Sequence, residues 1–300
     1  MFQPKAHNPG LAVLLMVTAT AFIAATTLFA KALGGQTLGP ALHPLQVSHG
    51  RFVFALLGIS AAVAVMRPTL TRPSWGLHFA RTFFGWGGVT LMFAAVTFIP
   101  LADATAIVFL NPVFGMILAI PLLSEKVGRI RWSAATIAFA GALILLRPTP
   151  ESFQIASLLA LAAALIMGFE IIFIKKLSGR ELPIQVLLIN NFLGVIIASV
   201  AVLGVWQMPT PAQWAMLVAL GLCMAMAQAC FVNAMARADA SFVAPFSYGT
   251  LIFATLYDIA FFDQIPDVVT LTGAGIILSG GVLLAWREAR LRQRAKNTTS

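Results

Sequence analysis

Long apolar runs dominate this chain, and short joints rich in proline and glycine separate them. Each run holds about 20 residues, the length that an α-helix needs to cross about 30 Å of hydrocarbon. Proline and glycine at the joints end helices, and the alternating pattern of porin strands is missing. We therefore predict ten membrane-spanning helices, at residues 11–33, 45–66, 74–97, 103–123, 130–147, 154–177, 184–205, 212–235, 241–262 and 268–287.

The composition excludes a water-soluble protein. Hydrophobic residues make up 60% of the 300 residues and charged residues only 10%, whereas a soluble domain carries about 25% charged residues. A disordered chain would be poor in apolar residues and rich in charge. The predicted fold class is therefore an all-α integral membrane protein, with little chain left for a soluble domain.

The positive charges predict an orientation. The chain has 19 Lys and Arg against 10 Asp and Glu, and 15 of the 19 lie in the two tails or in the joints after the second, fourth, sixth and eighth spans. Because cationic residues collect in cytoplasmic loops, both termini are expected in the cytoplasm. This distribution accounts for the excess of positive over negative residues, so nucleic acid is not an expected partner.

The sequence contains a weak internal repeat. The tripeptide Ala-Asp-Ala at 102–104 opens the fourth span, and the same tripeptide at 238–240 opens the ninth, 136 residues later. We predict two five-helix repeats, residues 1–150 and 151–300. Since five is odd, the second repeat enters the membrane from the opposite side. Inverted repeats around a central cavity are a feature of many secondary transporters.

Two stretches resemble the two repeats of the EamA family in the drug/metabolite transporter superfamily: ADATA…NPVF…PLLSEKVG at 102–128 and VAPFSYGTLIFATLYDIAFFDQIPD at 243–267. The resemblance covers nearly the whole chain and is closest to exporters of aromatic amino acids. It implies export of a small metabolite across a bacterial inner membrane. It also implies a cavity among the first, third, fourth, sixth, eighth and ninth spans.

Polar side chains inside the spans are candidates for a solute-binding site. Placing an ionisable group inside the bilayer costs free energy, so such groups usually have a function. Arg81 could meet a solute carboxylate or snorkel to the headgroups. Glu170 could line the cavity or pair with Lys175 or Lys176 of its own helix. Trp86 either lines the cavity or packs at a close helix contact. The expected substrate-binding residues are His78, Arg81, Trp86, Asn111, Glu170, Gln228 and Tyr248, of which Gln228 and Tyr248 are expected to touch the solute.

Other polar groups have structural expectations. Lys31 and Arg51 lie near the outer ends of the first two spans, where we expect their charges to reach the headgroups. Asp103 and Asp239 begin helices and are expected to cap them. The asparagines at 190–191 are less favoured as cavity residues than those above.

Proline and glycine occur together near the middle of the fourth and ninth spans. Pro112 is followed by Gly115, and Pro245 by Gly249. Proline removes one backbone hydrogen bond and bends a helix, and glycine tolerates changed backbone angles. We expect these pairs to be hinges that open the cavity to one side at a time. The alternative is a fixed kink that improves packing.

The sequence patterns of enzymes are missing. There is no phosphate-binding G-x-x-x-x-G-K-[ST] pattern, and the four histidines are scattered, so neither a cofactor nor a metal is expected. We expect a secondary transporter, a monomer in the lipid bilayer, that exports a small metabolite such as an aromatic or apolar amino acid without strong ion coupling. One alternative is a proton-coupled exporter of lipophilic cations that uses Glu170; another is a structural membrane subunit without transport activity.

Overall fold

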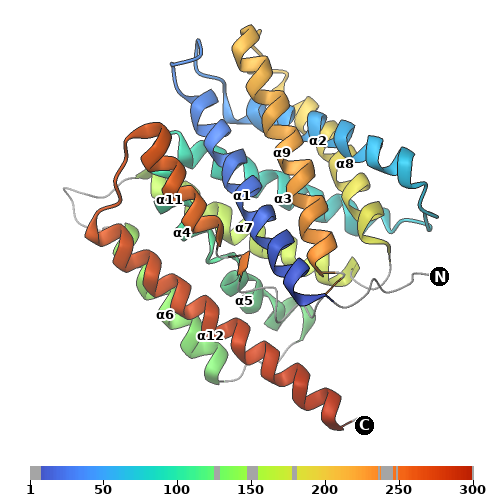
Figure 1. The fold of residues 1–300 in the computed structure, drawn as a ribbon, viewed down its shortest axis with the longest axis vertical. Coiled ribbons are helices and arrows are strands. Elements are labelled where there is room, and N and C mark those ends of the chain that lie inside the picture. Colours follow the sequence, from blue (N-terminus) through green and yellow to red (C-terminus); the bar gives the residue numbers. More distant parts are fainter. Residues whose placement is uncertain are drawn as a thin grey trace.

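The computed structural model describes residues 8–124, 129–146, 155–177, 181–235, 237, 246–247 and 249–298. The regular structure of these residues is helical (Figure 1). The α-helices are α1 (Pro9–Gly34), α2 (Pro44–Met66), α3 (Trp75–Val96), α4 (Leu101–Val108), α5 (Asn111–Leu123), α6 (Arg129–Leu146), α7 (Ile155–Leu177), α8 (Pro183–Val202), α9 (Pro211–Met235), α11 (Gly249–Phe262) and α12 (Val268–Thr298).

The predicted spans coincide with these helices. Seven spans in the described part are long and apolar enough to cross a membrane, one of them formed by α4 and α5 together. Shorter apolar stretches lie in α6, α11 and α12. The first residues of the ninth predicted span, 241–245, lie outside the described residues. α12 continues to Thr298, past the end predicted at residue 287.

The fourth span is broken. α4 ends at Val108, Phe109 and Leu110 form a turn, and α5 begins at Asn111. Pro112 occupies the second position of α5. Because proline has no N–H, it cannot donate to the carbonyl of Val108, so the helical ladder stops before it.

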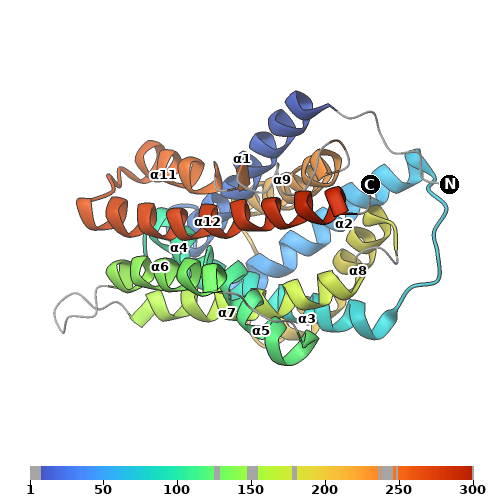
Figure 2. The same cartoon turned by 90° about the horizontal axis from the view of Figure 1, so that it is seen from below.

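Helix contacts in one predicted repeat have counterparts in the other. α1 packs on α9 as α7 packs on α3, and α1 packs on α11 as α7 packs on α5. α2 pairs with α8, and α6 pairs with α12 in an outer layer that both views show (Figure 1, Figure 2). This pairing is what two related five-helix units would produce.

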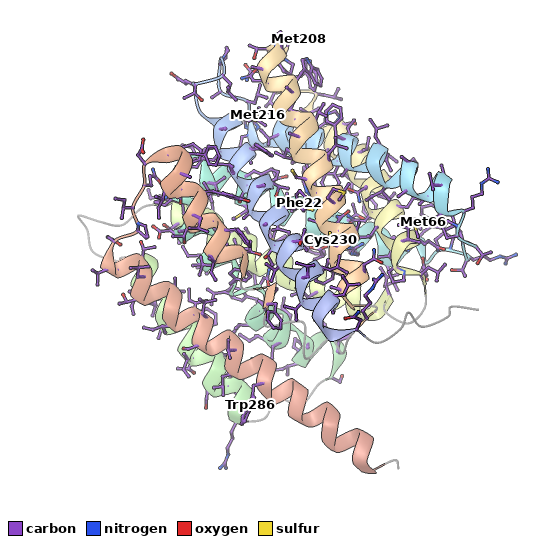
Figure 3. The ribbon with its side chains drawn as sticks, in the orientation of Figure 1. Phe22, Met66, Met208, Met216, Cys230 and Trp286 are labelled. Carbon is purple, nitrogen blue, oxygen red and sulfur yellow. The ribbon has the colours of Figure 1, made fainter. Side chains whose placement is uncertain are left out.

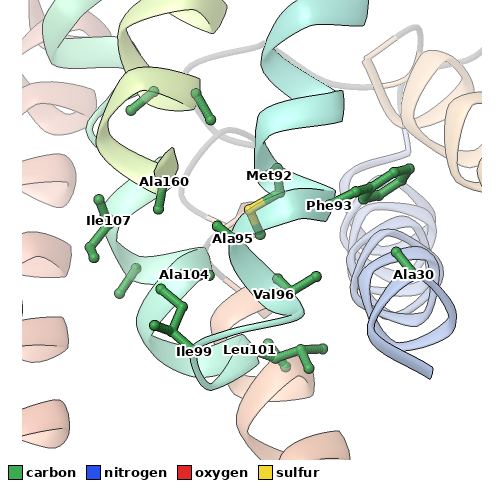
Figure 4. Close-up of a cluster of buried hydrophobic side chains, with 14 of the residues drawn as sticks. Ala30, Met92, Phe93, Ala95, Val96, Ile99, Leu101, Ala104, Ile107 and Ala160 are labelled. Carbon is green, nitrogen blue, oxygen red and sulfur yellow. The ribbon is translucent and has the colours of Figure 1, made fainter. Parts of the chain in front are cut away.

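Small residues bring helices close together, as is common where helices pack in membranes. A Cβ atom added at Gly141 of α6 would lie 2.7 Å from the carbonyl oxygen of Gly273 and from the amide nitrogen of Ile277 in α12. A second close region joins α1, α3, α4 and α7. Figure 4 shows its buried side chains, including Ala30, Phe93, Ala104, Ile107 and Ala160.

Apolar side chains also cover the outside of the bundle (Figure 3). Val65, Met66, Phe79 and Leu203 are among the large hydrophobic side chains that are exposed. An apolar exterior is expected of helices that face lipid.

Two names describe the ends of the bundle. The Lys31 end is where α1 finishes, and the joints at 35–43 and 203–210 meet there, since Thr210 Oγ1 donates to the Leu38 carbonyl at 2.9 Å. The Arg67 end is where α2 finishes. α12 begins at the Lys31 end, directly after the 263–267 joint, so its last residues lie toward the Arg67 end. The first residues of α1 lie toward the Arg67 end as well.

Candidate functional site

An ion pair joins α3 to α7 inside the membrane-spanning region. Arg81 Nε lies 3.6 Å from Glu170 Oε1, and the Arg81 side chain also donates from Nη1 to the Val186 carbonyl of α8 at 3.3 Å. Arg81 is only 7% exposed. It therefore does not snorkel to the headgroups, and Glu170 lies against α3 beside Arg81.

Glycines of α3 make room for this pair. A Cβ at Gly85 would lie 2.9 Å from Cδ and Oε1 of Glu170. One turn further, a Cβ at Gly88 would lie 2.6 Å from Cγ of Met167. Arg81, Gly85 and Gly88 share one face of α3, so this face of α3 is flat enough for the carboxylate to rest on it.

Arg51 of α2 is a second buried guanidinium, and it was not among the expected substrate-binding residues. It is 5% exposed, and its Nε and Nη1 have no hydrogen-bond partner among the described residues. Its charge interacts with those of Glu170 and Arg81, and its Cζ lies 4.4 Å from the centre of the Phe52 ring. The expectation that Arg51 reaches the headgroups is wrong, because neighbouring helices cover it.

Neutral polar groups continue the site along α2, α3, α8 and α9. Trp86 Nε1 and Thr90 Oγ1 both donate to Ser48 Oγ, at 3.1 and 3.0 Å. Asn191 Nδ2 donates to Gln228 Oε1 at 3.2 Å, while Asn191 Oδ1 is buried without a partner in the described part of the chain. Gln228, expected as a cavity residue, thus contacts Asn191, one of the two asparagines that were less favoured.

Aromatic rings stack between α3 and α7. The Phe84 ring lies 5.0 Å from that of Phe169 and 5.6 Å from that of Phe173, with interplanar angles of 17° and 11°. These rings belong to the helices that carry Arg81 and Glu170. A flat apolar surface therefore lies on the same helix pair as the buried charges.

His78 belongs to a separate cluster at the Arg67 end. His78 Nε2 lies 2.8 Å from Glu181 Oε2, and Glu181 also accepts hydrogen bonds from the Ser74 N–H and from Gln185 Nε2. Burial alone would raise the pKa of Glu181, but the bonds from Ser74, His78 and Gln185 together lower it. The cluster joins the start of α3 to the start of α8.

The remaining candidates are dispersed. Asn111 Nδ2 lies 3.8 Å from the sulfur of Met167, and Gly115 is buried against Ile171. Gly249 begins α11, where an added Cβ would lie 3.0 Å from Thr20 Oγ1. Tyr248, Pro245 and Asp239 lie outside the described residues.

A hollow of about 780 Å³ opens at the Lys31 end between α2, α3 and the joints around them. Its lining is mostly apolar, and Leu91, Ala94 and Phe98 of α3 contribute to it. Thr90, one of its polar residues on α3, donates to Ser48. The Ser48 cluster therefore borders this hollow through Thr90.

Comparison with known proteins assigns the chain to a family. The sequence model of the EamA-like transporter family matches it twice, at residues 10–147 and 154–286. The chain belongs to the EamA-like transporter family. The resemblance stated from the motifs is confirmed, and the protein is a membrane transporter and not an enzyme.

The relatives of this EamA-like transporter are named for several small metabolites. A riboflavin transporter of Vibrio cholerae is 29% identical over 97% of this chain and 98% of its own length. Another riboflavin transporter, of Rhizobium johnstonii, is 32% identical over 81% and 80%. An S-adenosylmethionine uptake transporter of Rickettsia bellii is 28% identical over 84% and 87%. The protein is thus a multi-pass transporter of small metabolites.

A solved crystal structure shares the fold of this transporter. The TM-score is 0.65 at 20% sequence identity, over 95% of this chain and 99% of the other. At that identity the likeness concerns the fold alone.

Proposed function

We propose that this transporter carries a planar metabolite with a hydrogen-bonding edge, of the riboflavin type, and that Arg51, Arg81 and Glu170 bind that edge. The observation that carries the proposal is the buried Arg51 guanidinium with two unpaired donors. Leaving such donors unsatisfied costs about 1–3 kcal/mol or more, so a solute that accepts hydrogen bonds there is favoured.

The chemistry of the three side chains suits an imide edge. The ring system of riboflavin carries a carbonyl, an N–H and a second carbonyl along one edge, which is an acceptor–donor–acceptor pattern. Two guanidinium donors beside one carboxylate acceptor are complementary to it. The stacked rings of Phe84, Phe169 and Phe173 offer an apolar surface for the rest of such a solute, and the riboflavin names of two relatives agree.

Transport by purified protein in proteoliposomes tests this proposal. Riboflavin flux should be saturable, and Arg51→Gln should reduce it about tenfold or more, because a hydrogen bond to a charged group contributes about 1.5–3 kcal/mol. Arg67→Gln is the matched control, since Arg67 lies exposed at the end of the same helix. Absence of riboflavin flux, or equal flux in Arg51→Gln and Arg67→Gln, would contradict the proposal.

Export of an aromatic or apolar amino acid is the second candidate, and the Arg81–Glu170 pair favours it. An arginine and a glutamate at 3.6 Å can bind the carboxylate and the ammonium group of a zwitterion. Phenylalanine and tryptophan flux in the same proteoliposomes distinguishes the two candidates. A lipophilic cation is disfavoured, because two guanidinium groups stand beside one carboxylate.

The proposal also includes outward transport by a monomer in the bacterial inner membrane, with both termini in the cytoplasm and with little ion coupling. The excess of Lys and Arg in alternate joints supports the orientation. Collapse of the pH gradient and the membrane potential should leave efflux down the solute gradient unchanged. A loss of solute accumulation under those conditions would mean that the transport is coupled.

A further inference from the structure

A charge cluster closes the Lys31 end of the bundle. Lys31 Nζ of α1 lies 2.8 Å from Asp258 Oδ1 of α11 and 2.9 Å from Gln264 Oε1. It also lies 4.3 Å from the centre of the Phe262 ring. The Asp258 side chain is 2% exposed and that of Lys31 is 11% exposed, so the pair is largely screened from solvent.

Asp258 holds a third helix as well. Its Oδ2 accepts the backbone N–H of Ala102 at 3.0 Å, in the first turn of α4. The start of a helix carries unpaired N–H groups and partial positive charge, which a carboxylate stabilises. One carboxylate therefore connects α1, α11 and α4, which come from both predicted repeats.

The cluster can open without leaving a buried charge alone. Removing one partner of a buried ion pair is strongly destabilising when the other stays buried and unpaired. Here Asp258 keeps the N–H of Ala102 after Lys31 leaves. Lys31 lies three residues before the end of α1, where its long side chain can reach water. Each charge thus has a second partner, which suits a contact that forms and breaks repeatedly.

The break in the fourth span separates the segment that Asp258 holds, α4, from α5. α4 packs on α11, α7 and α12, whereas α5 packs mainly on α7. The turn at Phe109 and Leu110 separates the two segments. A shift of α4 together with α11 therefore slides α4 along α7 while α5 keeps its packing.

The same helix end carries a lysine in the other repeat. Residues 29–33 read Phe-Ala-Lys-Ala-Leu, and residues 173–177 read Phe-Ile-Lys-Lys-Leu, 144 positions later. Because the repeats are predicted to be inverted, these two lysines belong to opposite ends of the bundle. Each repeat thus has a lysine at the end of its first helix, where the cavity would close on that side.

We propose that Lys31 and Asp258 are gating residues of the transport cycle. Their ion pair closes the Lys31 end, and opening separates α1 from α11 and α4. The inference goes beyond the proposed substrate and does not depend on which solute is carried.

Cross-linking tests whether this contact must break. The background is the full-length protein with Cys223→Ser and Cys230→Ser. Lys31→Cys and Asp258→Cys are introduced into it, and a short, reducible bifunctional thiol reagent joins the two new thiols. Opening is followed by thiol labelling of a third cysteine at Thr27, one turn along α1 from Lys31. Cross-linking should abolish labelling from the Lys31 end, and reduction should restore it. Unchanged labelling after cross-linking would overturn the proposal.

Single substitutions test the charge itself. Lys31→Met and Asp258→Asn should each raise the labelling rate of the cysteine at Thr27 about fivefold or more, the usual size of a shift between two states. Asp258→Asn keeps an oxygen for the N–H of Ala102, so α4 stays capped. Lys176→Met is the control, because Lys176 lies over the Phe173 ring near the Arg67 end. Wild-type labelling rates in both gate variants would overturn the proposal, and labelling requires no knowledge of the substrate.

Discussion

Adding one methyl group to α3, by Gly85→Ala, should weaken solute binding. The added Cβ would lie 2.9 Å from Cδ and Oε1 of Glu170, whereas carbon atoms pack at about 3.5–4.0 Å. The backbone of α3 is held by Gly88, which packs equally tightly on Met167. The carboxylate must therefore retreat from its position beside Arg81.

The size of the effect follows from this displacement. The Arg81 Nε–Glu170 Oε1 distance of 3.6 Å would lengthen by about 0.6–1 Å if normal contact distances are restored. With an effective dielectric constant of about 20, that change weakens the attraction by about 0.7–1 kcal/mol. A solute bound by the same carboxylate loses a similar amount, so its KM should rise about three- to fivefold.

Gly87→Ala is the matched control for this measurement. Its Cβ would meet only Ile166 Cγ2, at the ordinary distance of 3.7 Å, and it gains the same helix propensity as Gly85→Ala. Initial rates of solute flux in proteoliposomes, measured over a range of concentrations, give both KM values. The reasoning is refuted if Gly85→Ala has the wild-type KM, or if Gly87→Ala shows the same rise.

The spans could be predicted because a helix in lipid must satisfy its backbone internally and cover itself with apolar side chains. The details that the spans do not give are where one helix ends and where another breaks. α12 continues past the predicted span end at residue 287 to Thr298, because Arg, Ala, Leu, Gln and Lys all favour helix. At Pro112 a bend was expected, and the helix breaks one turn earlier because the missing N–H affects the carbonyl of Val108.

The candidate site could be predicted only in part. Arg81 and Glu170 were singled out separately, since charges inside spans are rare. Their pairing depends on the close approach of α3 and α7, for which the glycines at 85 and 88 were the available signal. Arg51 was misjudged because a position near a helix end does not reveal how far neighbouring helices cover it. Lys31 and Asp258 are 227 residues apart, and only the tertiary fold joins them.

Three further variants test separate contacts. Gly141→Val should lower the melting temperature in detergent, because its Cβ meets backbone atoms of α12 that cannot rotate away, whereas Gly275→Val, with no heavy atom within 4 Å, should not. Glu181→Gln should be less stable than wild type near pH 7. Since the folded pKa of Glu181 lies below its ordinary value of 4.5, its contribution is complete above that value and is lost as the pH falls below it. The stability gap must therefore narrow on acidification, and a constant gap would contradict this reasoning. Pro112→Ala restores an N–H and allows one continuous helix through the break, so turnover should slow while solute affinity changes little. Pro121→Ala, in the same span but away from the break, is its control. If the break is a hinge, only Pro112→Ala slows the exchange between the states that open to the two sides of the membrane. Equal turnover in both variants would mean that the break only serves helix packing.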